Sequence, residues 1–102
     1  MTCTTTFDGP YGETLSVQLG IYQNGQPKVQ LWADEDGGFK SPYGSLSVAS
    51  NQPVDLTLGE FLAKTWFENE EIASCALKSG LFIDTGRRVL IGHEEAHVWK
   101  IA

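Results

Sequence analysis

The pattern with the clearest chemical potential in this sequence of 102 residues is the segment His93-Glu94-Glu95-Ala96-His97. On a helix, two histidines four residues apart bind one zinc ion, and the glutamate after the first histidine activates the metal-bound water. His93 and His97 would then be the metal ligands of a minimal zinc-dependent hydrolase, with Glu94 as its base.

The residues on either side of this segment argue against a helix. Residues 89–91 and 98–101 alternate in the manner of β-strands, and an extended chain does not place the two imidazoles on one helical face. None of the residues after His97 is His, Cys, Asp or Glu, so no third ligand follows the pair. We expect a hairpin with ordinary histidines and a protein without catalytic residues, metal or cofactor. The zinc hydrolase is the alternative.

Two further segments carry weaker signals. The run Asp34-Glu35-Asp36-Gly37-Gly38 begins like a calcium loop, but a glycine stands where the third ligand should be, and a solvated turn is the better interpretation. Residues 85–88 (Thr-Gly-Arg-Arg) lack the lysine of a phosphate loop and are expected to begin a strand. In the hairpin expected there, Arg88 lies opposite Trp99 and makes a cation–π contact.

The charge of the chain restricts its partners. Thirteen acidic and seven basic residues give a formal net charge of −6 and a pI near 4.7. Phosphate backbones repel such a chain, so we expect no direct nucleic-acid binding and instead a partner that is a protein with a basic surface or a small molecule. The binding residues that we predict are acidic side chains at turns and at a helix start, with a merely solvated surface as the alternative: Asp34, Glu35, Asp36, Glu68, Glu70, Glu71, Glu94 and Glu95.

The sequence also indicates a cellular compartment. It has no apolar run of the roughly 18 residues that span a bilayer, and its first residues lack the basic and apolar regions of a secretion signal. The two cysteines are therefore expected to be thiols. We expect a cytoplasmic protein that does not bind membranes, and we leave its oligomeric state open, a homodimer included.

Short-range patterns predict a single α+β domain over residues 1–102. Apolar residues alternate over Glu13 to Tyr22 and again over Lys28 to Ala33, which predicts two strands. A three-residue loop over residues 23–25, with Gly25 in the left-handed conformation, pairs Leu19 with Val29 and turns both apolar faces inward. The word Pro-Tyr-Gly occurs at 10–12 and at 42–44, and we interpret both copies as turns that lead into strands.

The second half is predicted to contain two helices and a hairpin. A third strand holds Leu46 and Val48, and a capping-box pattern at residues 57–60 precedes apolar positions at helical spacing as far as Trp66. A second helix follows Asn69 and ends at Gly80. Strands at 87–91 and 96–101 form a hairpin with a loop over 92–95. The predicted order is β-β-β-α-α-β-β, a mostly antiparallel sheet of about five strands with two short helices on one face.

The C-terminal half also shows a family resemblance. The words that carry it are Glu60-Phe61-Leu62-Ala63-Lys64-Thr65-Trp66-Phe67-Glu68-Asn69-Glu70, Gly80-Leu81, Thr85-Gly86-Arg87-Arg88 and residues 92–101. They resemble a family of small acidic proteins, without an assigned activity, encoded on bacterial plasmids, integrative elements and phages. Membership implies mobile-element biology, in which small acidic domains often bind and inhibit host machinery. The partner that the resemblance implies is a host or phage protein with a basic surface.

Together these features predict a non-enzymatic protein-binding domain of a mobile element or phage. Its most specific form would be an inhibitor of a host defence system, such as a CRISPR or nuclease complex. The alternatives are the zinc hydrolase and a small-ligand or nucleotide-binding protein.

Overall fold

The computed structural model describes residues 5–34 and 39–102, which contain two antiparallel sheets and one α-helix. The first sheet has the order β1-β2-β3-β4, with strands Thr5–Asp8, Thr14–Ile21, Pro27–Asp34 and Lys40–Ser45. The second has the order β5-β7-β6, with β5 at Glu60–Ala63, β6 at Phe82–Ile91 and β7 at Glu94–Ile101. A 3-10 turn, η2 (Phe67–Asn69), leads directly into helix α1 (Glu70–Lys78). The predicted α+β class is confirmed, but the predicted five-stranded sheet with two helices is wrong in detail.

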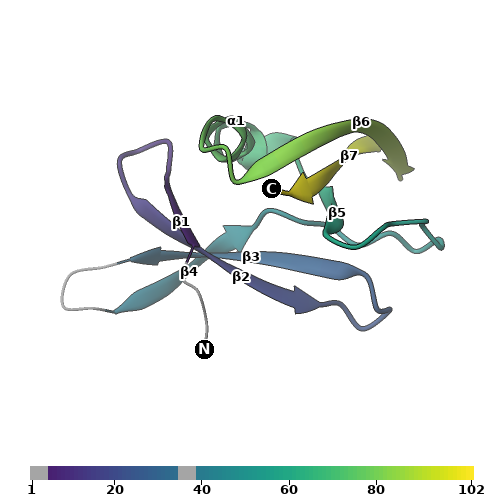
Figure 1. Ribbon diagram of the computed structural model, residues 1–102, viewed down its shortest axis with the longest axis horizontal. Coiled ribbons are helices and arrows are strands. Elements are labelled where there is room, and N and C mark those ends of the chain that lie inside the picture. Colours follow the sequence, from purple (N-terminus) through teal and green to yellow (C-terminus); the bar gives the residue numbers. More distant parts are fainter. Residues whose placement is uncertain (1–4, 35–38) are drawn as a thin grey trace.

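The short segment after β4 joins the two sheets. Leu46 donates its backbone N–H to Val29 of β3 at 2.9 Å. On its other side the segment bonds to β5 and the residue after it, through Val48 N–H to Leu62 O at 3.0 Å and Lys64 N–H to Leu46 O at 2.8 Å. The two sheets are therefore linked edge to edge, and Figure 1 shows α1 above the first sheet and beside the start of β6.

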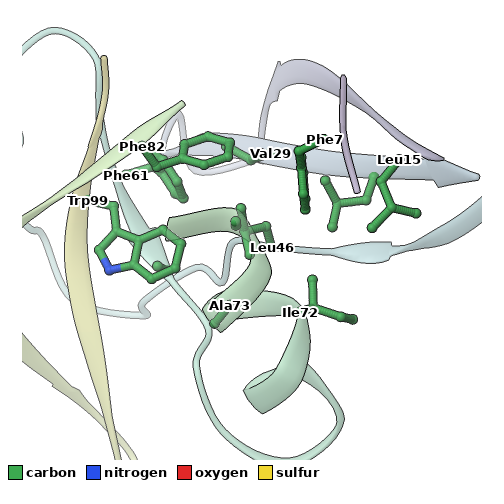
Figure 2. Packing of buried hydrophobic residues seen from close by; sticks show 12 residues of the cluster. Phe7, Leu15, Val29, Leu46, Phe61, Ile72, Ala73, Phe82 and Trp99 are labelled. Carbon is green, nitrogen blue, oxygen red and sulfur yellow. The ribbon is translucent and has the colours of Figure 1, made fainter. Parts of the chain in front are cut away.

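The main core lies where the two sheets and α1 meet. Figure 2 shows Phe7 and Leu15 from the first sheet facing Ile72 of α1, with Leu46 between the sheets. Four aromatic rings complete this core with centroid separations of 5.7–6.3 Å, three of the four contacts being edge-on: Phe7, Phe61, Phe82 and Trp99. Buried aromatic rings of this kind contribute strongly to core stability because each removes a large apolar area from water.

The β2–β3 hairpin confirms the predicted loop. Leu19 pairs with Val29, and Gly25 has a φ of 87° at the end of a three-residue turn. The expectation of a fully buried face is wrong for the half near the turn, where Leu19 is 60% and Ile21 72% exposed. Val29, which pairs with Leu19, is only 1% exposed, so the core reaches β3 at this point but does not cover the end of β2.

The first predicted helix is instead a turn followed by strand β5. The Thr57 N–H bonds to the Glu60 carboxylate at 2.9 Å, as in a capping box, but Gly59 has a φ of 86° and ends the turn in a conformation that a helix cannot continue. All four residues of β5 are buried, between the core on one face and a second apolar cluster on the other. When a short apolar run is buried on both faces, its hydrophobic periodicity does not distinguish a strand from a helix.

The second predicted helix is confirmed as α1, and Gly80 follows it with a φ of 81°. Asn69 is the residue before α1, but its side chain makes no capping hydrogen bond. The third predicted strand is misplaced, because β4 ends at Ser45 and the residues from Leu46 to Val48 form the link between the sheets. Strand β1 has no strong apolar alternation and was not predicted.

The C-terminal hairpin is confirmed, with a shorter loop than predicted. Ile91 pairs with Glu94 across a two-residue turn in which Gly92 has a φ of 61°. Val89 consequently lies opposite Ala96, two residues from the predicted register, and the faces are unchanged because the shift is even. Arg88 lies opposite His97 and not Trp99, so the predicted cation–π contact is wrong.

Candidate functional site

The two histidines of the H-E-x-x-H segment lie on extended chain. His93 is in the β6–β7 turn and His97 is four residues further along, within β7. Four residues of extended chain span roughly 13 Å, and strand side chains stand away from the sheet without converging. This pair cannot adopt the close tetrahedral arrangement that zinc requires of its ligands. His93 and His97 therefore do not form the pair of zinc ligands on which the zinc-hydrolase alternative depends.

His97 belongs instead to a charged cluster on the second sheet. Its Nδ1 atom is 3.8 Å from Asp84 Oδ2, and Arg88 binds the same carboxylate with two nitrogens at 2.9 and 3.1 Å. The Arg88 guanidinium, by hydrogen bonding above all, holds the pKa of Asp84 below its ordinary value. The cluster flanks a β-bulge at Gly86, whose φ is 88°. The pair of Asp84 and Arg88 lies within β6, and the contact to His97 reaches β7.

The acidic residues predicted to bind a partner do not form one patch. Asp34, at the end of β3, pairs with Lys40 at 2.6 Å, whereas Glu94 and Glu95 begin β7 beside the β6–β7 turn. Figure 1 shows these two places at opposite ends of the long axis. Glu35 and Asp36 lie outside the residues that the structure describes.

The remaining three predicted acids gather at η2 and the first turn of α1. Glu68 pairs with Lys64 at 2.6 Å, and the pKa of Glu68 is lowered chiefly by that hydrogen bond. Glu70 and Glu71 are exposed in the first helical turn, where the helix dipole favours negative charge. Glu68 lines a hollow in the structure.

That hollow is a cavity of about 740 Å³ between β4 and the η2–α1 segment. This volume lies in the usual range for ligand pockets. Three tyrosines line it: Tyr11 from the β1–β2 turn, Tyr22 from the end of β2 and Tyr43 from β4. The spacing of these residues did not predict the cavity. The repeated Pro-Tyr-Gly word is the one signal that points to it, because both copies contribute a tyrosine to the same lining.

Hydrogen bonds fix two of these rings. The Tyr22 hydroxyl is 2.8 Å from Ser47 Oγ, and that serine in turn accepts the backbone N–H of Val29 at 2.8 Å. The Tyr43 hydroxyl donates to Glu13 Oε2 at 3.0 Å. Burial, and after it the Glu13 carboxylate, raises the pKa of Tyr43 to about 12. The phenol is therefore neutral at physiological pH.

Tyr11 connects the cavity to the acidic group. Its ring is 79% exposed, and its backbone N–H donates to Glu13 Oε1 at 2.8 Å. The Glu71 carboxylate raises the pKa of the Tyr11 hydroxyl, by side-chain hydrogen bonding first and by its charge second. We call the surface formed by Tyr11, Glu13, Phe67, Glu68, Glu70 and Glu71 the acidic aromatic face.

Asn69 lies at the base of the cavity and is only 3% exposed. Its amide nitrogen donates to Ser45 O at 2.7 Å and to Lys64 O at 3.2 Å, which ties β4 to the segment before α1. Its side-chain oxygen accepts no hydrogen bond from residues 5–34 or 39–102. This oxygen is not fully enclosed, since the one enclosed side-chain polar atom without a partner in those ranges is Trp99 Nε1.

No protein-family model, curated protein or solved structure matches the chain. The resemblance of the C-terminal half to acidic mobile-element proteins therefore stays a prediction. Across the part of the chain that the structure covers, no helix combines the length and apolar character needed to cross a membrane.

Proposed function

We propose that this protein is a non-enzymatic binding domain that recognises a basic surface on another protein through its acidic aromatic face. The observation that carries the proposal is that Tyr11 and Glu68 line one cavity and that the Glu71 carboxylate acts on the Tyr11 hydroxyl. Phe67 and Glu70 flank these acids in the chain. Tyr11 is 79% and Phe67 71% exposed, beside Glu68, Glu70 and Glu71. Exposed aromatic side chains are frequent energetic anchors of protein interfaces, and carboxylates around them select a positively charged partner.

The backbone of Phe67 supports this proposal. Its φ of 54° is in the left-handed region, which a bulky residue adopts at a cost of about 1–3 kcal/mol. Asn69, two residues later, is anchored by hydrogen bonds to Ser45 and Lys64, and these hold the segment in place. Strain at an exposed aromatic residue is typical of positions that are kept for binding and not for packing.

The net charge of −6 supports a partner that is itself basic, because opposite charges accelerate encounter. Nucleases and nucleic-acid-guided defence complexes carry basic surfaces where they bind phosphate backbones. An acidic domain that occupies such a surface would compete with the nucleic acid. Inhibition of a host defence or nuclease complex in the bacterial cytoplasm, by a protein of a phage or other mobile element, is therefore the most specific form of this proposal.

The test compares two variants with the same change in charge. Glu70→Gln with Glu71→Gln removes two charges from the acidic aromatic face, and Glu94→Gln with Glu95→Gln removes two from β7. Partners captured from a bacterial lysate at about 50 mM salt are identified, purified and titrated with all three proteins, then again at about 500 mM salt. We expect weaker binding for the first variant alone and at the higher salt. Equal binding by both variants, or binding that salt does not weaken, would refute the proposal.

The cavity favours a second candidate, a small-ligand or nucleotide-binding protein. A volume of about 740 Å³ can hold a molecule of that size. A thermal-shift screen with nucleotides and metabolites tests it, because a ligand that binds the native state raises the apparent melting temperature.

A further inference from the structure

The chemistry of the cavity between β4 and α1 identifies a more specific ligand group. We propose that it receives the guanidinium group of an arginine side chain on the partner protein. This inference rests on the proposed function and names the residue that the acidic aromatic face recognises. Three observations carry it: the tyrosine lining, the unpaired oxygen of Asn69 and the local balance of charge.

The tyrosine lining provides π faces for a cation. Tyr11, Tyr22 and Tyr43 come from three separate places in the first sheet and meet at one cavity. Guanidinium groups stack on aromatic rings more readily than ammonium groups do, because they are planar and weakly hydrated. The Tyr22 ring already lies 5.6 Å from Lys28 Nζ, so a cation is attracted to this ring within the protein itself.

The second observation is a hydrogen-bond acceptor that has no donor among the described residues and is not fully enclosed, so that water or a ligand can reach it. Asn69 is buried and both of its nitrogen contacts are made to the chain, while its oxygen has no donor within the described residues. Buried polar groups are almost always paired, by protein, water or ligand. A guanidinium offers five N–H donors in a planar fork, so it can reach this oxygen while its plane lies against a ring.

The charge at the cavity also favours a cation. Lys64 is its one basic lining residue, and its Nζ atom is 2.6 Å from Glu68 Oε1, so its charge is neutralised. Glu13 contacts Tyr43 and Glu71 acts on Tyr11, which adds two carboxylates at the rim. An anionic ligand would have to displace Glu68 from Lys64 and would be repelled by the other two. The carboxylates at the rim of the cavity therefore favour a cationic ligand.

The test uses three capped tripeptides that differ in one side chain, with arginine, lysine or citrulline between two glycines. Citrulline has nearly the shape of arginine and no charge. Each peptide is titrated into the full-length protein while backbone amide signals are followed by NMR. We expect the arginine peptide to shift the signals of residues 43–45 and 64–69, and to bind more tightly than the lysine and citrulline peptides. Equal binding of arginine and citrulline, or of arginine and lysine, would overturn the proposal.

Two variants separate the cavity from general surface effects. Tyr11→Ala removes an exposed ring of the lining, and Phe39→Ala removes an equally exposed ring at the start of β4, which does not line the cavity. We expect Tyr11→Ala to weaken binding of the arginine peptide by about two- to thirty-fold, the usual range for a cation–π contact. Phe39→Ala should leave it unchanged. Equal affinities for both variants would show that the peptide binds elsewhere.

The outcomes for the peptide and for the partner protein are independent. If the arginine peptide does not bind but partner capture still depends on Glu70 and Glu71, the cavity assignment is wrong and the proposed function stands. If the peptide binds as expected and no charge-dependent partner is found, the cavity assignment stands and the proposed function is wrong.

Discussion

The junction between the two sheets depends on one serine, and its removal should be costly. Ser47 is 3% exposed, and its Oγ atom accepts the backbone N–H of Val29, a residue that is itself 1% exposed. Val29 O still accepts the backbone N–H of Leu46, but the Val29 N–H bonds to the Ser47 hydroxyl in place of a backbone carbonyl. Ser47→Ala leaves the Val29 N–H buried without an acceptor.

The expected loss follows from the chemistry of that group. A buried donor without a partner costs about 1–3 kcal/mol. The Tyr22 hydroxyl also loses its 2.8 Å contact to Ser47, but it keeps its contact to Ser45 Oγ at 3.3 Å. This second loss therefore adds little to the destabilisation. We therefore expect Ser47→Ala to lower the free energy of unfolding by about 2 kcal/mol. For a domain of this size that corresponds to a fall of about 8–16 °C in melting temperature.

Urea unfolding, followed by tryptophan fluorescence and analysed by linear extrapolation, measures this loss. The control is Ser74→Ala, at an exposed position of α1, which should change the free energy of unfolding by less than about 0.5 kcal/mol. Tyr22→Phe should lie between the two, at about 0.5–1.5 kcal/mol. A loss for Ser47→Ala no larger than that of the control would mean that the Val29 N–H finds another acceptor and that the junction does not depend on this serine.

Three further predictions test the fold. Gly59→Ala should destabilise by about 1–2 kcal/mol in urea unfolding because of its positive φ, whereas a helix at this position would gain about 1 kcal/mol from the same change. Leu46→Ala should cost about 2–5 kcal/mol by calorimetry, since this side chain is fully buried where the sheets meet, and a value near zero would contradict the core described above. The lowered pKa of Asp84 stabilises the fold above its unfolded-state pKa of about 4, and this stabilisation is lost as the pH falls through the folded-state value. Asp84→Asn should therefore be less stable than the wild type at neutral pH and show a flatter acid dependence in unfolding titrations, and parallel titrations for the two proteins would contradict this.

Several elements could be predicted because their signals are local. Alternating apolar residues and Gly25 together specify the β2–β3 hairpin and its three-residue loop. Gly80 ends α1 because a glycine tolerates the left-handed conformation that closes a helix. The C-terminal hairpin was also predicted from local alternation of apolar residues. This alternation on both sides of the two histidines was enough to argue against a helix there.

Other features depend on contacts between residues far apart in the chain. Residues 60–63 form a strand because β7 and the segment after β4 bond to them on either side, and four residues carry no information about those partners. Exposure of Leu19 and Ile21 could not be predicted either, because it depends on how far the core extends over β2.

The amino-acid sequence by itself thus determined the class of fold, the two hairpins, the helix after Asn69 and the net negative charge, since composition and nearest neighbours decide these. The tertiary structure alone decided which acids share a surface and that Tyr11, Tyr22 and Tyr43 line one cavity with Asn69. Successive members of this group are 11, 21 and 26 residues apart in the sequence. The pairing of β2 with β3 and of β3 with β4 brings the tyrosines together, and the hydrogen bonds of Asn69 to Ser45 and Lys64 place Asn69 beside them.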